Sequence, residues 1–195
     1  MRFTSHLDLY RAWERLLRRA GIPLVFSQGY NPRPKLQLAA PLPLGITSRA
    51  EIIDFWSTES PFVVDTIKLQ LVESAPPGIE IQTIEMIDPA APPLQKKVVA
   101  AQYQVTLLDN VRDLDRKIEA LLAAESIMRE RRGKTYDLRP LVKELSDVPG
   151  DPQHLFMLLN AGESSTGRPE EVLLALGIQP ENTCIERTRL IFHDS

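Results

Sequence analysis

Residues 5–23 read SHLDLYRAWERLLRRAGIP and contain the signals that begin and end one amphipathic helix. Ser5 is suited to the N-cap, and an acidic residue three positions later completes a capping box. Apolar residues recur at helical spacing along one face: Leu9, Trp13, Leu16, Leu17 and Ala20. Gly21 suits the C′ position, and Pro23 cannot continue a helix. The stretch therefore predicts a helix that begins after Ser5 and ends before Gly21.

The rest of the chain alternates between strand patterns and helix patterns. In the first half we expect strands over 24–27, 35–39, 50–57 and 79–87, and a helix over 61–74 with Pro61 at its first position. In the second half we expect strands over 98–108, 154–160 and 184–192, helices over 111–124, 140–145 and 168–176, and a hairpin over 127–138. Residues 88–93 hold three prolines in six positions, which is typical of a stiff linker.

Both halves follow the order β-α-β-β-α-β, which is the ferredoxin-like pattern. We therefore predict an α+β protein of two tandem ferredoxin-like halves, residues 1–88 and 98–195, joined by a proline-rich linker over 89–97. The first half lacks most of its opening strand, because only four residues precede Ser5. We expect either a segment upstream of Met1 or a start assigned too late.

Composition narrows the function classes. The 195 residues are 43% hydrophobic and 25% charged, which is enough apolar material for a folded core. No run approaches the ~20 apolar residues that span a bilayer, and no signal peptide is visible, so we expect a cytoplasmic protein without a membrane partner. One cysteine, Cys184, and three histidines exclude a disulfide framework and a thiolate-ligated cluster within the chain, and we expect no metal site. Cys184 is predicted to be buried in an apolar strand.

Charge is unevenly distributed along the chain. The net charge is −3, but residues 1–50 carry +6, residues 51–95 carry −7, residues 96–145 carry +3 and residues 146–195 carry −5. An acidic protein of this kind is not a general polyanion binder. A local basic surface can still bind one.

Three sequence features are candidate anion-binding sites. The polar face of the first helix carries four arginines, and the loop after it adds an aromatic residue that can stack on a base: Arg11, Arg15, Arg18, Arg19, Tyr30, Arg33 and Lys35. The predicted hairpin carries Arg129, Arg131, Arg132 and Lys134 around Gly133. The loop over 162–169 supplies hydroxyls and one cation, Ser165, Thr166 and Arg168. Each has an alternative interpretation: a solvated helix face, a solvated hairpin tip, and a helix N-cap at Thr166.

His6 is a weak catalytic candidate. An imidazole at a helix N-terminus is held neutral by the dipole and is able to act as a base, with Tyr10 and Lys35 as partners. The alternative is a histidine that only hydrogen-bonds the neighbouring loop. The sequence fixes no second acid or base beside it.

Four motifs in order carry a resemblance to a known family. They are the run over residues 2–21, FSQGYNP over 26–32, PLPLG over 41–45 and TYDLRP over 135–140. Together they closely resemble the bacterial radical-SAM-linked proteins, a domain family of unknown function that occurs beside, or fused to, radical SAM proteins with a cobalamin-binding region. The resemblance covers nearly the whole chain. It implies no cofactor in this chain and a radical SAM partner that holds the 4Fe-4S cluster, SAM and cobalamin.

The leading hypothesis is a non-catalytic accessory module that binds RNA, or another anionic substrate, for a radical SAM enzyme. One alternative is a metal-independent endoribonuclease that uses His6, since tandem ferredoxin-like halves also look like CRISPR repeat-processing endoribonucleases; that analogy is at the level of the fold only. Another alternative is a scaffold that binds proteins alone.

Overall fold

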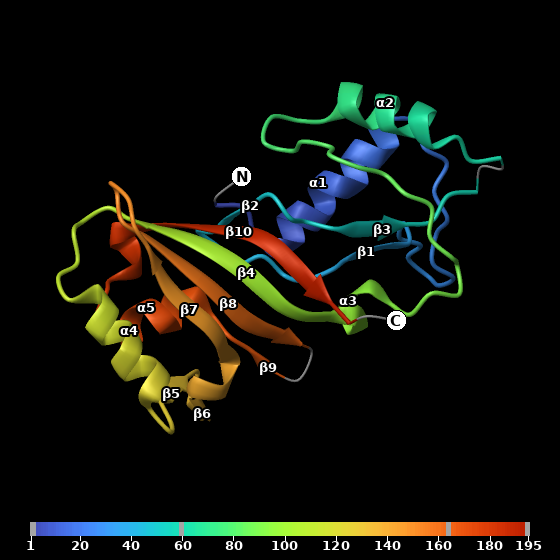
Figure 1. Ribbon diagram of the computed structural model, residues 1–195. Helices are drawn as coiled ribbons and strands as arrows, with labels where there is room; N and C mark the ends of the chain where they lie inside the picture. Colours follow the sequence, from blue (N-terminus) through green and yellow to red (C-terminus); the bar gives the residue numbers. More distant parts are fainter. Residues whose placement is uncertain (1–2, 59–60, 163–164, 194–195) are drawn as a thin grey trace. The chain divides into compact units, whose positions relative to one another are not determined.

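The computed structural model describes residues 3–58, 61–162 and 165–193, which combine α-helices with mostly antiparallel sheets (Figure 1). The α+β class is therefore confirmed. The chain divides into two units, one made of Met1–Gly45 with Ile52–Leu94 and the other of Ile46–Glu51 with Gln95–Ser195. The segment over 46–51, which the sequence analysis placed in the first half, thus belongs with the second unit.

The first helix has the predicted ends. Helix α1 spans His6–Arg19, and the Ser5 hydroxyl oxygen accepts a hydrogen bond from the Asp8 backbone N–H at 3.2 Å. Gly21 has a φ of 71°, and its N–H and that of Ile22 donate back to carbonyls of the last turn. These two bonds form a Schellman motif, which needs the left-handed conformation that glycine adopts at little cost.

The rest of the first unit packs on the apolar face of α1. Strands β1 (Leu36–Leu38) and β3 (Ile53–Phe55) pair antiparallel, and helix α2 spans Val64–Ser74. Leu16 and Leu17 are fully buried, and they share one core with Ile67 and Leu71 of α2. The apolar stripe predicted on the first helix is therefore the side of α1 that faces this core.

Three predictions for the first unit were wrong. Residues 24–27 form only isolated bridges, Leu24 with Ser57 and Phe26 with Pro34, and no continuous strand. Helix α2 begins at Val64 after the N-cap Val63, so Pro61 precedes the helix. Residues 79–87 form no strand, because their backbone has no neighbouring strand to pair with; Ile79, Ile81 and Ile84 pack against the core instead.

The second unit is built on one larger sheet in the order β2-β10-β4-β8-β7. Its strands are β2 (Thr47–Ser48), β4 (Val98–Leu107), β7 (Val142–Val148), β8 (His154–Gly162) and β10 (Thr183–Phe192), and β9 (Ser165–Thr166) pairs with β8. Every neighbouring pair is antiparallel except β2 with β10. The alternating burial along β4 and β8 places their apolar side chains in the core.

Helices and a hairpin complete the second unit (Figure 1). They are α4 (Leu114–Ala123), α5 (Pro169–Ala175), the 3-10 helices η1 (Arg139–Leu141) and η2 (Pro180–Asn182), and the hairpin strands β5 (Met128–Arg131) and β6 (Lys134–Asp137). The short helix α3 spans Leu94–Lys97, within the range predicted as a linker. The predicted helix over 140–145 was wrong: η1 ends there and β7 begins. Cys184 is exposed rather than buried, because it points away from the core between Thr183 and Ile185.

Two tandem ferredoxin-like halves are not confirmed. The second unit runs β4-α4-β7-β8-α5-β10, with the β5–β6 hairpin inserted between α4 and β7 and the short β9 between β8 and α5. The described part of the first unit has only the two-stranded sheet of β1 and β3. The sequence patterns of the two halves were alike, but they do not produce the same sheet.

A buried ion pair attaches residues 46–51 to the second unit. Arg187 on β10 is 1% exposed, and its Nη2 lies 2.6 Å from Oε1 of Glu51. The guanidinium Nε donates to the same oxygen at 3.0 Å. In the residues that the structure describes, no helix has the length and apolar character needed to cross a membrane.

Candidate anion-binding site

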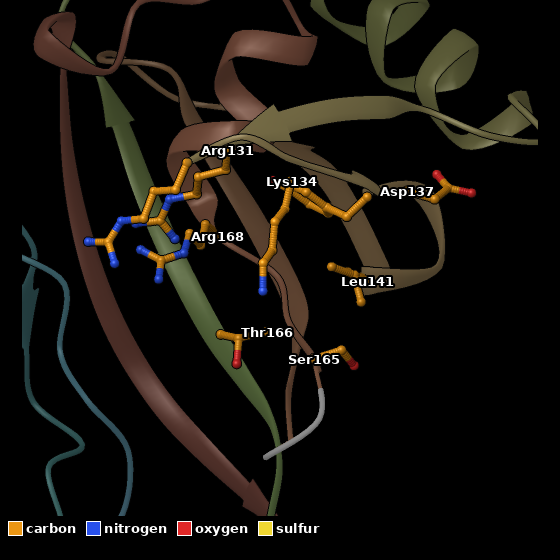
Figure 2. A pocket seen from close by; sticks show the side chains of 9 residues that line it. Arg131, Lys134, Asp137, Leu141, Ser165, Thr166 and Arg168 are labelled. Atoms are coloured by element: carbon orange, nitrogen blue, oxygen red, sulfur yellow. The ribbon is translucent and has the colours of Figure 1, made fainter.

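Two of the sites predicted separately from the sequence meet in one pocket of the second unit. The pocket has a volume of about 510 Å³. It is lined by the hairpin, by η1, by β9 and by the N-cap of α5, with Arg131, Arg132, Lys134, Tyr136, Asp137, Leu141, Ser165, Thr166 and Arg168 (Figure 2). The basic hairpin and the hydroxyl-bearing loop are therefore two walls of one site.

The hairpin turn presents three of the basic residues. Arg131 and Lys134 are cross-strand partners in the antiparallel pair, so the turn between them holds only two residues. These are Arg132 and Gly133, with φ angles of 50° and 73°. Positive φ at both positions is the type I′ geometry that fits the twist of a two-residue hairpin. Arginine is unusual there, since glycine, asparagine and aspartate adopt this conformation more readily.

The TYDLRP motif fixes the base of the hairpin. The Asp137 carboxylate accepts hydrogen bonds from the backbone N–H groups of Ile127 and Arg139, at 2.8 and 3.0 Å. These two bonds lower the pKa of Asp137 below its ordinary value. The Arg139 guanidinium in turn donates to the carbonyls of Leu122 and Val142, which ties the hairpin base to the end of α4 and the start of β7.

Arg129 has a structural role rather than a place in the pocket. Its Nε donates to Oε2 of Glu171 at 2.9 Å, and both side chains are largely buried. Glu171 belongs to α5, so this ion pair holds the hairpin against the helix that follows Arg168. Of the four basic residues predicted in the hairpin, Arg129 is the one that does not line the pocket.

The opposite wall is held by Asn160 and Gly167. Asn160 Nδ2 donates to the carbonyl and hydroxyl oxygens of Ser165 at 2.7 and 2.8 Å, and the Asn160 carbonyl accepts from the Gly167 N–H at 2.8 Å. Gly167 is buried against η1. This places Ser165, Thr166 and Arg168 beside the hairpin. Glu163 and Ser164 of the predicted loop lie outside the described residues.

The pocket collects positive charge. In Figure 2 the side chains of Arg131, Lys134 and Arg168 reach toward the same part of the pocket, whereas the Asp137 carboxylate lies away from them. Among the described residues, no ion pair includes Arg131, Arg132, Lys134 or Arg168. Burial, and then the nearby charge of Arg131, lower the pKa of Arg168. The charge of Glu170 on α5 opposes this lowering in part. Cations gathered in one pocket are the arrangement that an anion stabilises.

The aromatic and apolar residues of the pocket were not predicted as site residues. Tyr136 is half-buried, and burial followed by the charge of Glu171 raises its pKa. Leu141 lies on η1 and contributes an apolar surface. The TYDLRP motif and its position next to the basic hairpin were the available signal for Tyr136. Leu141 directly follows that motif, but no sequence pattern indicates its long-range contact with Gly167.

The cationic face of α1 lies in the first unit and is partly neutralised. Arg11 lies 3.7 Å from Asp8, and Arg18 lies 2.9 Å from Glu14, in exposed pairs on the same helix. Arg15 and Arg19 are exposed. Such surface pairs contribute little to stability, but they reduce the net charge of the face.

The loop after α1 exposes one aromatic residue at its tip. The backbones of Ser27 and Arg33 bond to each other across the loop, and the Arg33 N–H also donates to the Ser27 hydroxyl at 3.0 Å. Tyr30, between them, is fully exposed. Lys35 is not free to extend this surface, because its Nζ lies 4.2 Å from the centre of the Trp56 ring in a cation–π contact.

His6 lies at the exposed first turn of α1. Its two suggested partners are engaged elsewhere: Tyr10 Oη donates to the Pro34 carbonyl at 3.2 Å, and Lys35 lies over Trp56. Burial also raises the pKa of Tyr10. Within the described part of the chain, no three His, Cys, Asp or Glu side chains are placed to share a metal ion.

Fold and site together define an α+β protein with a cationic pocket between a β-hairpin and a β–α segment. The chain belongs to DUF2344, a family of uncharacterized proteins conserved in bacteria, whose family model matches residues 1–169. All of the pocket residues fall within that range.

A solved structure of a Cbf5-Nop10-Gar1 complex contains a chain with a similar fold. The similarity covers 100% of this chain and 48% of that chain, with a TM-score of 0.50 and 12% sequence identity. The present chain thus corresponds to about half the length of that protein, and the similarity concerns the fold alone. A comparison with curated proteins found no match.

Proposed function

We propose that this chain is a non-catalytic accessory module that binds RNA, or another anionic substrate, on behalf of a radical SAM enzyme. The observation that carries the proposal is the convergence of Arg131, Lys134 and Arg168 on one pocket. These cations come from two segments that lie far apart in the sequence, and each segment is held in place by its own hydrogen bonds.

The chemistry of the pocket supports an anionic ligand. Arginine presents a planar array of donors that pairs with phosphate or carboxylate through two parallel hydrogen bonds. The hydroxyls of Ser165 and Thr166 add further donors on the opposite wall. The volume of about 510 Å³ lies within the range of ~300–1,000 Å³ that is usual for ligand sites.

The first unit supports a nucleic acid as the anion. Tyr30 is a fully exposed aromatic residue at a loop tip, with Arg33 in the same loop. Exposed aromatic rings beside cations are the usual platform for single-stranded bases.

The radical SAM partner rests on the resemblance carried by the four sequence motifs. A 4Fe-4S cluster takes three or four cysteine ligands, and this chain has a single cysteine. The cluster, SAM and cobalamin would then belong to the partner. In this arrangement the chain holds the substrate while the partner performs the chemistry.

The test is recovery of the full-length chain from its native bacterial cells, followed by sequencing of bound RNA and mass spectrometry of bound protein. We expect both an enriched RNA and a radical SAM protein, and we expect Arg131→Gln/Arg168→Gln to lose the RNA and keep the protein. A radical SAM protein without RNA or any other anion would favour the scaffold. Cleavage of RNA in EDTA that disappears in His6→Ala would favour the endoribonuclease.

A further inference from the structure

We infer that the pocket takes the terminal phosphate monoester of a nucleotide, rather than the internal phosphodiesters of an RNA chain. This inference rests on the proposed function and names the part of the ligand that the pocket recognises. Its supports are the concentration of charge in one place, the engagement of two neighbouring carboxylates elsewhere and the mixed chemistry of the walls.

The first support is the distribution of cations. Arg131 and Lys134 are directly opposite each other in the hairpin, and Arg168 approaches from the other wall (Figure 2). An internal phosphodiester carries one negative charge, and a surface that follows a backbone spreads its cations along the strand. A phosphate monoester carries about −1.5 to −2 charges and three acceptor oxygens at a single point. Cations gathered from two walls match the monoester better.

The second support is that two carboxylates near the pocket are bound to partners other than the pocket cations. The carboxylate of Asp137, the acidic lining residue, is occupied by two backbone N–H groups. Glu171 nearby is paired with Arg129 instead. The charge of Glu170 on α5 does act on Arg168. The four cations that line the pocket outnumber these carboxylates, so a ligand with more than one negative charge gains most from binding there.

The third support is the room and the surface beside the phosphate. The pocket volume of about 510 Å³ is in the range of ~300–1,000 Å³ that small-molecule sites have, so a nucleoside has room beside its phosphate. Tyr136 offers an aromatic surface and Leu141 an apolar one. The hydroxyls of Ser165 and Thr166 match the polar groups of a ribose or a phosphate. A nucleotide uses all of these groups, whereas inorganic phosphate leaves Tyr136 and Leu141 without a ligand surface to contact.

The experiment compares oligoribonucleotides of one sequence that carry a 5′-phosphate, a 3′-phosphate or hydroxyls at both ends, in equilibrium binding to the full-length chain. We expect at least one phosphorylated form to bind about tenfold more tightly or better than the hydroxyl form. Arg168→Gln should remove that preference. Arg116→Gln, which removes an exposed cation of α4 outside the pocket, should leave it unchanged.

Competition with a free nucleoside monophosphate and with inorganic phosphate shows whether the pocket takes the phosphate of an RNA end, of a free nucleotide or of the inorganic ion. Displacement of the RNA by the nucleotide supports the inference. Binding of the nucleotide without any binding of RNA supports the monoester and assigns it to a free nucleotide. If the three oligoribonucleotides bind with equal affinity and Arg168→Gln abolishes that binding, the inference is wrong and the proposed function stands. No binding of RNA, nucleotide or phosphate overturns both.

Discussion

Gly167 lies against Leu141 so closely that a β-carbon on Gly167 would be 3.0 Å from the Leu141 carbonyl oxygen. The same β-carbon would be 3.1 Å from Cβ of Leu159 on β8. Only glycine fits this position without movement of the backbone around it. The contact brings the segment before α5 against η1, and it is the reason that Arg168 and the hairpin share a pocket.

Gly167→Ala should therefore destabilise the second unit. Overpacking a tight site usually costs about 1–3 kcal/mol, and urea unfolding followed by circular dichroism measures it. Gly162→Ala is the matched control, because its β-carbon would meet only Asn160 Nδ2 at an ordinary distance of 3.9 Å. A Gly167→Ala protein as stable as the control would show that the backbones separate easily.

Arg132 lines the pocket but has a backbone conformation that arginine rarely adopts. We therefore expect it to favour ligand binding and to lower the stability of the hairpin. Its φ of 50° is one that asparagine adopts more readily in a type I′ turn. Arg132→Asn should raise the free energy of unfolding by up to about 1 kcal/mol, since a left-handed residue costs roughly 1–2 kcal/mol when its side chain is unsuited. The same change should weaken binding of phosphorylated RNA. A variant that is less stable, or that binds equally well, contradicts this trade-off.

Asp137 should make stability depend on pH. Its folded pKa is lowered from the ordinary value of 3.8 by the N–H groups of Ile127 and Arg139. A lowered folded pKa adds stability that is complete above the unfolded pKa and is lost as pH falls through the folded value. Asp137→Asn should thus be less stable than the wild type at pH 7, with the difference shrinking below pH ~4. A difference that stays constant down to pH ~2 would contradict this role.

The Glu51–Arg187 pair should be essential to the attachment of residues 46–51. Glu51→Ala removes the carboxylate that faces the buried Arg187 guanidinium, and removal of one partner from a buried pair typically costs about 3–5 kcal/mol. Glu186→Ala removes the carboxylate of the more exposed pair with Arg49 at 3.5 Å, where about 0–1 kcal/mol is expected. Thermal or urea unfolding compares the two variants. Equal losses would mean that burial does not distinguish these pairs.

Short sequence motifs predicted the structure correctly where an element depends only on residues close to it in the sequence. The caps of α1 depend on Ser5 and Gly21, and the hairpin turn depends on Gly133; these elements formed as predicted. The strand predicted over 79–87 was wrong because a strand needs a partner, and Ile79, Ile81 and Ile84 pack on the core without one. The start of β7 was predicted to belong to a helix over 140–145, because the residues of β7 alone do not indicate that they pair with β8.

The candidate site was predicted in pieces and assembled only by the fold. The basic hairpin and the hydroxyl loop were both recognised, but their meeting depends on the approach of Gly167 to Leu141 and on the pair between Arg129 and Glu171. Such interactions join segments that lie far apart in the sequence, so hydrophobic periodicity and composition do not indicate them. The cations of α1, which looked stronger in the sequence, are partly paired with acids on the same helix.

The most direct test measures RNA affinity as a function of salt for three full-length proteins: the wild type, Arg131→Gln/Arg168→Gln and Arg15→Gln/Arg19→Gln. Both variants remove two positive charges, so they differ only in the surface affected. We predict that the pocket variant binds at least about tenfold more weakly, with a salt slope shallower by about 0.7 for each phosphate that it no longer neutralises. The helix variant should stay within about threefold of the wild type. An unchanged affinity in Arg131→Gln/Arg168→Gln would contradict the assignment of the pocket as the anion-binding site.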